Sequence, residues 1–234
     1  VSIRPVTGQN TIRLTRQEVT QSCRVSVIVR PTKTLIAGYR KMKSGLWIGL
    51  DPGGSNKLAL SYLRGKTAES CRVSSIADAL NKIEEEPLGI GIDAPLWWSA
   101  RKTGIRKADK WIQEEYDISQ KTVQAVNSMW GSVIVQGMLF AAKIRERFPD
   151  VNITESHPKA LRMASGLNSA AEWLRERSIV FETENDDELD ATIAAICARE
   201  GFSGNWDKDL ASDRFPEEQD PKNQWFGPVY YFWP

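Results

Sequence analysis

Three short segments of the chain are apolar and end in an acidic residue: 46–51, 88–93 and 151–155. Segments of this length, rich in branched apolar residues, predict buried strands. Two further strand patterns, 58–63 and 70–75, follow the first segment and are joined by the polar loop 64–69, while helical patterns separate the later strands. This order predicts an α/β fold of three layers, with a mixed five-stranded sheet flanked by helices.

The acids at the strand ends indicate where a functional site lies. If the three strands run parallel, Asp51, Asp93 and Glu155 meet at the carboxyl edge of the sheet, where open α/β sheets place their sites. Each acid alone is a weak signal, because turns often begin with Asp. Their convergence at one edge is the more specific signal.

The segment NDDELDATIAAICARE (185–200) predicts a helix with an acidic start and an apolar body. Asn185 is a typical N-cap residue and Glu188 suits a capping box, so capping and the helix dipole explain most of the acidic start. They do not explain Asp190, which the helical period places beside the buried stripe, with Asp187 one turn earlier on the same face. A carboxylate there needs a metal or an arginine partner, and both interpretations stay open.

Composition narrows the kind of site. The chain has three scattered cysteines and one histidine among 234 residues, which argues against a zinc site. A metal held by carboxylates would be magnesium, manganese or calcium. The cysteine pattern indicates reduced thiols, and neither a membrane span nor a signal peptide is recognisable. We therefore expect a cytoplasmic protein that contacts no membrane.

The first 45 residues differ from the rest of the chain in charge. They carry a net charge of +8, against −7 for the remainder. A basic segment of this kind is typical of nucleic-acid binding, but an exposed extension without a role explains it equally well. The segment 24–30 alternates as a hairpin strand would, and the sequence from Met42 looks like a natural beginning. We therefore expect 1–45 to be an extension, either non-native or a hairpin, and 46–234 to be the folded domain.

Several carboxylates at one edge repel one another, and a bound divalent cation relieves that repulsion. Two cations about 4 Å apart can clamp the attacking water and the leaving oxygen of a phosphoryl displacement. The carboxylate set therefore suits metal-dependent phosphoryl chemistry.

Six motifs occur in a characteristic order: GLDPGG at the first strand, GIDAPL at the fourth, RKADKWIQ at 106–113, TESHPKAL at 154–161, the acidic final helix and the ending WFGPVYYFWP. In this order they resemble the RNase H-like superfamily, and most closely a widespread family of uncharacterised proteins predicted to be RNase H-like nucleases. The final helix is also similar to that of Holliday-junction resolvases. The resemblance covers about four fifths of the chain and implies a nuclease that uses Mg²⁺ or Mn²⁺ to hydrolyse DNA or RNA.

The resemblance also implies roles for individual residues. The predicted metal ligands are Asp51, Asp93, Asp187 and Asp190, and Asp51 would bridge both metals. Glu155 and His157 match the fifth-strand motif and are further catalytic candidates. Arg106, Asp109 and Lys159 are weaker candidates for substrate contact.

Other interpretations remain open for the same residues. Asp51 and Asp93 could simply end strands, Glu155 could pair with a nearby Lys or Arg, and His157 could be a capping or packing residue. The segment GLDPGGSNKLAL also resembles the phosphate-binding turn of sugar kinases and actin, which would make the chain an ATP-dependent phosphotransferase. A third possibility is a non-catalytic nucleic-acid-binding protein of the same fold.

Overall fold

The centre of the structure, a computed structural model, is a mixed five-stranded sheet in the order β3-β2-β1-β4-β5. The structure describes residues 45–53, 57–129, 131–183 and 185–234. The strands of this sheet are β1 (Leu46–Asp51), β2 (Ala59–Arg64), β3 (Thr67–Arg72), β4 (Gly89–Ile92) and β5 (Asn152–Glu155). β1 pairs antiparallel with β2 and parallel with β4, and β4 pairs parallel with β5. The predicted α/β class and mixed sheet are confirmed.

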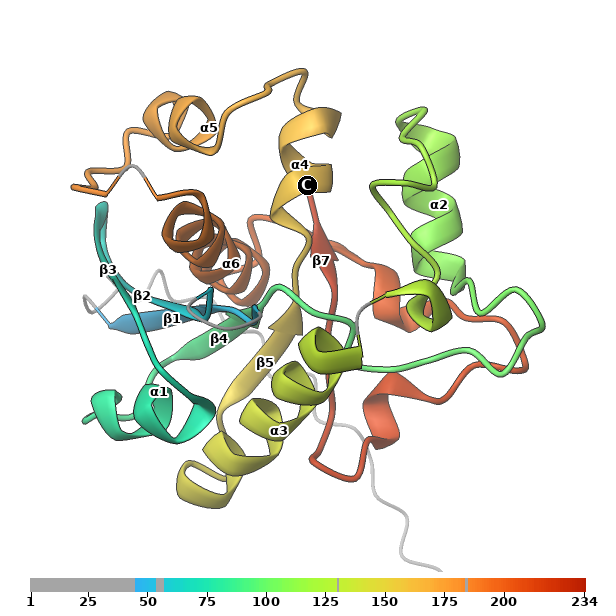
Figure 1. Ribbon diagram of the computed structural model, residues 1–234, viewed down its shortest axis with the longest axis horizontal. Coiled ribbons are helices and arrows are strands. Elements are labelled where there is room, and N and C mark those ends of the chain that lie inside the picture. Colours follow the sequence, from blue (N-terminus) through green and yellow to red (C-terminus); the bar gives the residue numbers. More distant parts are fainter. Residues whose placement is uncertain (1–44, 54–56, 130, 184) are drawn as a thin grey trace, which may run out of the picture. The chain divides into compact units, whose positions relative to one another are not determined.

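Helices cover both faces of the sheet (Figure 1). They are α1 (Ile76–Lys82), α2 (Lys107–Glu115), α3 (Gly131–Arg147), α4 (Pro158–Ala164), α5 (Ala170–Glu176) and α6 (Asp186–Phe202), with 3-10 turns at Val126–Ser128, Leu210–Ser212 and Pro221–Asn223. In Figure 1, α1 and α3 lie on one side of the sheet and α4, α5 and α6 on the other. The sheet is therefore the middle of three layers.

Two strand glycines allow α6 to lie against the sheet. A Cβ atom at Gly49 would collide with the carbonyl oxygen of Ala191, and one at Gly91 would collide with the carbonyl oxygen of Ala194. Both alanines are fully buried in the body of α6. Because small residues stand on both sides, the helix backbone packs directly on β1 and β4. The acidic start of α6 is thereby carried to the edge of the sheet.

The β2–β3 connection is shorter than the sequence predicts. Arg64 is paired with Thr67, so only Gly65 and Lys66 form the turn. Gly65 adopts a φ of 58°, a conformation that glycine allows without strain. The predicted loop 64–69 and strand 70–75 were therefore wrong in their boundaries, because this tight turn lets pairing begin at Thr67.

The C-terminal segment closes the outer edge of β5. The Glu155 amide donates to the Tyr230 carbonyl at 2.8 Å, and the Tyr230 amide donates to the Ile153 carbonyl at 3.1 Å. The segment then forms β7 (Phe232–Trp233), which pairs with β6 (Lys208–Asp209). Tyr231 and Trp233 are buried, as expected for an aromatic segment that packs on the fold.

Two predictions concern parts of the chain beyond these elements. The basic extension and its hairpin at 24–30 lie outside the described residues, of which only Gly45 belongs to the first 45. Within the described ranges, no helix is both long enough and apolar enough to cross a membrane.

The close approach of α6 predicts a strong effect of Gly91→Ala on stability. The added methyl group must push α6 away from β4, and we expect a loss of about 3 kcal/mol in the free energy of unfolding. Gly131→Ala is the matched control, because a Cβ there meets no described atom within 4 Å and alanine favours a helix. Urea unfolding followed by tryptophan fluorescence measures both; equal midpoints for the two variants would contradict the packing argument.

Candidate functional site

The three parallel strands bring their acidic ends to one edge of the sheet. Asp51 is the last residue of β1, Asp93 directly follows β4, and Glu155 is the last residue of β5. The Asp93 amide continues the ladder by donating to the Leu50 carbonyl at 2.8 Å. The predicted convergence of these acids at the carboxyl edge is therefore observed.

The start of α6 adds two carboxylates to this edge. The Asn185 side chain accepts a hydrogen bond from the Glu188 amide at 3.2 Å, so the predicted N-cap is confirmed. Within the first turns, Asp187 and Asp190 lie near enough to Asp51 to raise the pKa of its carboxyl.

Burial and mutual repulsion disfavour ionisation of the two strand acids. The pKa of Asp51 is raised well above its usual value, first by burial and then by the charges of Asp93, Asp190 and Asp187. Burial likewise raises the pKa of Asp93, with further contributions from Asp190 and Glu155. Asp51 therefore lies at the electrostatic centre of the group.

Asp190 has a basic neighbour on α4. Its Oδ2 lies 3.5 Å from Arg162 Nη2, and both side chains are largely buried, with 18% and 13% exposed. Burial raises the pKa of Asp190 to about 6, although Arg162 and Lys159 oppose the shift. Within the described residues, Asp190 Oδ1 and Arg162 Nε are buried without a hydrogen-bond partner. The pair is therefore only half satisfied, with a free acceptor beside a free donor.

Asp187 lies further out than Asp190. Its carboxylate forms an ion pair with Arg72 at 3.3 Å, and 27% of its side chain is exposed. Of the two open interpretations of the helix acids, the arginine pairing is thus observed, and both acids also lie near Asp51.

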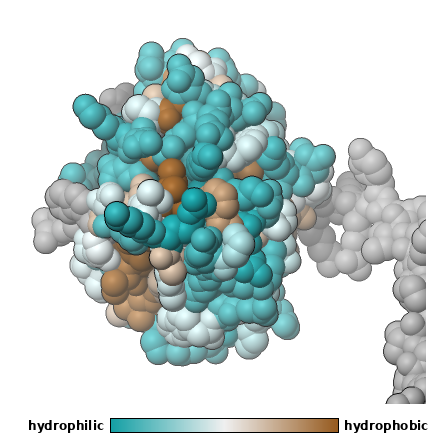
Figure 2. All heavy atoms as spheres, turned by 90° about the vertical axis from the view of Figure 1, so that its right-hand side faces the viewer, coloured by the Kyte–Doolittle hydropathy of each residue, from teal (hydrophilic) through white to brown (hydrophobic). Residues whose placement is uncertain are grey.

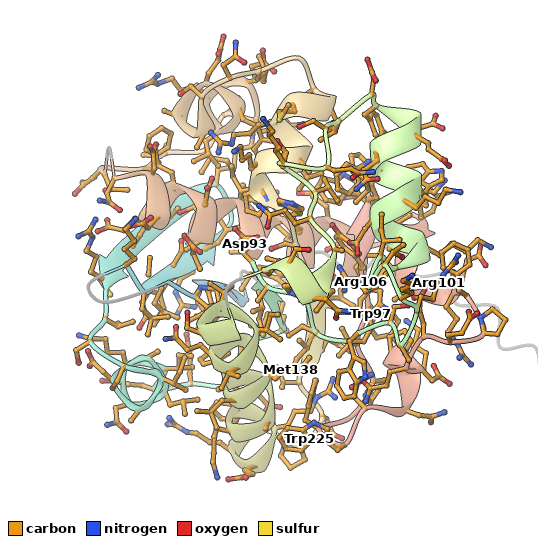
Figure 3. The ribbon with its side chains drawn as sticks, turned by 45° about the vertical axis from the view of Figure 1, so that its right-hand side comes forward. Asp93, Trp97, Arg101, Arg106, Met138 and Trp225 are labelled. Atoms are coloured by element: carbon orange, nitrogen blue, oxygen red, sulfur yellow. The ribbon has the colours of Figure 1, made fainter. Side chains whose placement is uncertain are left out.

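Glu155 is held in a buried network that differs from the rest of the edge. Arg106 donates to its two oxygens at 2.6 and 2.8 Å, and the Leu96 amide donates to it at 2.9 Å. Arg106 also contacts both oxygens of Asp109, at 2.7 and 2.9 Å. Its guanidinium lies 4.2 Å from the Trp97 ring centre. Figure 3 shows Arg106 and Trp97 next to each other, to the lower right of Asp93.

These contacts indicate a positioning role for Glu155, Arg106 and Asp109. All three are about 2% exposed. Arg106 also donates to the Trp97 carbonyl at 3.4 Å, and with the Leu96 contact of Glu155 it fixes the loop that follows Asp93. The pairing of Glu155 with a basic residue, an alternative in the sequence interpretation, is thus observed. The predicted substrate contacts of Arg106 and Asp109 would require the buried network to open.

His157 lies beside a small cavity next to Asp93. Its Nε2 is 3.2 Å from the Thr122 carbonyl, and burial lowers its pKa to about 4, so the ring is neutral at physiological pH. Its Nδ1 and the hydroxyl of Ser156 are buried and have no partner among the described residues. Both residues line a cavity of about 30 Å³ that Asp93 and Gln124 also border, which is room for a water molecule.

The described acids are not arranged as a complete set of metal ligands. Within the described residues, no three His, Cys, Asp or Glu side chains are close enough together to hold an ion. The donor chemistry nevertheless suits a hard divalent cation, because the group consists of carboxylates and includes the free oxygen of Asp190. Coordination by the predicted set Asp51, Asp93, Asp187 and Asp190 would require these side chains to rotate toward one another.

Sequence reasoning missed Arg162. It follows the predicted substrate residue Lys159 by one helical turn on α4, a spacing visible in the sequence. Its acidic partner is 28 positions away on α6, so no local pattern could reveal the contact. Lys159 itself is exposed, and its charge acts on Asp190 from the same helix.

Comparison with known proteins gives no match: no family model, no curated protein and no solved structure is significantly similar to this chain.

The buried network predicts a large cost for Arg106→Ala. The substitution leaves two buried carboxylates without their partner, and we expect a loss of about 3–5 kcal/mol in the free energy of unfolding. Arg64→Ala is the control, because Arg64 pairs with Glu85 at the surface and such pairs contribute about 1 kcal/mol or less. Guanidinium unfolding measures the difference; a loss below 1 kcal/mol for Arg106→Ala would show that the network is dispensable.

The raised pKa of Asp190 predicts that stability falls as pH rises. The folded state binds the proton more tightly than the unfolded state, so the stabilisation present at low pH is lost as pH passes through about 6. For Asp190 alone, this amounts to about 1.4 kcal/mol between pH 5 and pH 7.5. Denaturant unfolding of metal-free protein at both pH values should show a smaller decrease for Asp190→Asn. The exposed Asp150→Asn is the control, and equal decreases in all three proteins would contradict the assignment.

Proposed function

We propose that this chain is a metal-dependent nuclease of the RNase H-like type that hydrolyses phosphodiester bonds of nucleic acid. One observation carries the proposal: Asp51, Asp93 and Asp190 converge at the carboxyl edge of three parallel strands, where burial raises the pKa of each and the charges of Asp93 and Asp190 raise that of Asp51 further. A protein that used these acids only to end strands and cap a helix would gain nothing from burying them together. The order of the sequence motifs agrees with this type of site.

The electrostatics support a central role for Asp51. It is the only acid of the described group whose pKa is raised by the three others together, by Asp93, Asp190 and Asp187. A ligand that bridges two ions must be near all of their other ligands. Bound Mg²⁺ or Mn²⁺ would activate a water molecule and stabilise the charge that develops on the phosphate.

Basic side chains lie near the acids. Arg162 and Lys159, both on α4, act electrostatically on Asp190, and Lys57 acts on Asp51. Arg162 Nε is buried without a partner within the described residues, and a movement of this side chain toward the substrate would let it donate to a phosphate oxygen. Carboxylates for the metal beside cations for the phosphate are the arrangement that a phosphodiester substrate requires.

The remaining predicted residues position the loops next to the four aspartates. Glu155 and Arg106 hold the loop that carries Asp93, and Asp109 completes the charge balance around Arg106. His157 is neutral and in contact with the Thr122 carbonyl, so it orients the residues after β5. We therefore assign substrate chemistry to the four aspartates and positioning to this second group.

Cleavage of labelled single- and double-stranded DNA and RNA tests the proposal. We expect cleavage of at least one substrate with Mg²⁺ or Mn²⁺ and none with EDTA. Asp51→Asn should lower the rate by a factor on the order of 10² or more, because it removes a ligand of both ions. Asp150→Asn is the matched control, since Asp150 is exposed just before β5, at the opposite edge of the sheet.

A second measurement tests metal binding without any nucleic-acid substrate. Mn²⁺ should raise the melting temperature of the wild type and of Asp150→Asn more than that of Asp51→Asn, because bound ligand stabilises the folded state. Robust ATP turnover with all nucleic acids left intact would instead support a phosphotransferase and contradict the proposal. Equal cleavage by Asp51→Asn and wild type would also overturn it.

A further inference from the structure

A hollow of about 430 Å³ lies beside α2, between the segments that precede and follow this helix, and its lining includes the apolar residues Ile105 and Ala125. Its volume is in the range of small-molecule sites. Most of its lining side chains carry amide or hydroxyl groups, and one is a lysine: Gln113, Gln120, Gln124, Thr103, Ser128 and Lys121. Among the described residues that line it, none is acidic.

Defined contacts hold the wall of the hollow. Gln113 on α2 donates to the Val123 carbonyl at 2.7 Å, and Val123 is buried. Next to the lining residues Thr103 and Ser128, Gly104 has a φ of 68° and packs so closely on Asn127 that a Cβ would collide with the Asn127 side chain. The hollow is therefore part of the folded structure and not a gap between loose loops.

The hollow adjoins the carboxylate edge. Gln124 lines the hollow and also borders the small cavity that Asp93 and His157 share. The Thr122 carbonyl, two residues earlier, contacts His157 at 3.2 Å. Gln124 therefore separates the hollow from the small cavity beside Asp93 and contacts both.

The lining chemistry identifies the kind of group that fits. The Gln113 and Gln124 amides donate to the Val123 and Lys121 carbonyls, at 2.7 and 3.1 Å. Each amide retains a second N–H and an oxygen, a donor and an acceptor that match the edge of a nucleobase. The lysine can meet a backbone phosphate without an acidic neighbour in the described lining to repel it. The face of the molecule that carries α2 is mostly hydrophilic, with hydrophobic residues confined to a few patches (Figure 2). The mixed lining of the hollow therefore suits an occupant that has both a polar edge and an apolar face.

We propose that this hollow binds the base of a nucleotide adjacent to the bond that is cut. The inference rests on the proposed nuclease function and adds a subsite to it. Gln120 and Gln124 contact the base edge, and Lys121 contacts the neighbouring phosphate.

Single-stranded oligonucleotides that carry one abasic site at successive positions test this subsite. For the wild type, an abasic residue at one fixed position from the cut should raise KM about fivefold to tenfold, the loss of one or two hydrogen bonds. Gln124→Ala and Gln120→Ala should raise KM for the intact substrate by a similar factor, and the abasic residue should then add little. kcat should change less than twofold. Asn152→Ala is the control, because Asn152 is an exposed amide at the start of β5, at the opposite edge of the sheet.

The outcomes separate this inference from the proposed function. Cleavage with unchanged KM in both glutamine variants would overturn the subsite and leave the nuclease function intact. If no substrate is cut, fluorescence anisotropy with the same oligonucleotides decides. Weaker binding by the glutamine variants than by Asn152→Ala would support the subsite without the nuclease. Equal binding, or no binding by the wild type, would overturn the subsite.

Discussion

The direct packing of α6 on β1 and β4 is the constraint on which the rest of the structure depends. Gly49 and Gly91 leave no side chain between the strand backbones and the helix, so the helix axis is fixed relative to the sheet. Asp190 projects from that helix and Asp51 from the end of β1. The separation of their backbone positions is therefore set by backbone contact, which tolerates little adjustment, and only rotation of the side chains changes the distance between the carboxyl groups. If α6 packed less closely on the sheet, Asp190 would lie farther from Asp51.

Sequence patterns predicted the parts of the fold that depend on local spacing. The acid-ended strands, the acidic final helix and its Asn185 cap each follow from residues that are neighbours in the chain. The start of β3 was missed because the tight turn at Gly65 depends on one positive φ that the polar composition of the loop concealed. The convergence of Asp51 and Asp93 was predictable once the strands were taken to be parallel.

The partners of the charged residues could not be predicted in the same way. Arg106 is an exposed-type residue in a polar stretch, and nothing local indicates that it is buried against Trp97 and bound to Glu155, 49 positions away. Arg162 was missed for the same reason. These contacts decide which acids are free for chemistry: Glu155 is fully engaged, whereas one oxygen of Asp190 has no partner among the residues that the structure describes. Sequence alone placed both acids at the edge but could not rank them.

The closure of β5 by the C-terminal segment has a consequence for synthesis of the chain. The Glu155 amide reaches its partner only when Tyr230 has been made, and Asp190 reaches Asp51 only when α6 has been made. Asp51, at the end of β1, therefore comes close to Asp190 only after most of the polypeptide has been synthesised. On the ribosome, β1 and its hairpin with β2 can form early, because that pairing is local. The carboxylate site itself is assembled only late in translation, so a partly made chain carries its acids apart and solvated.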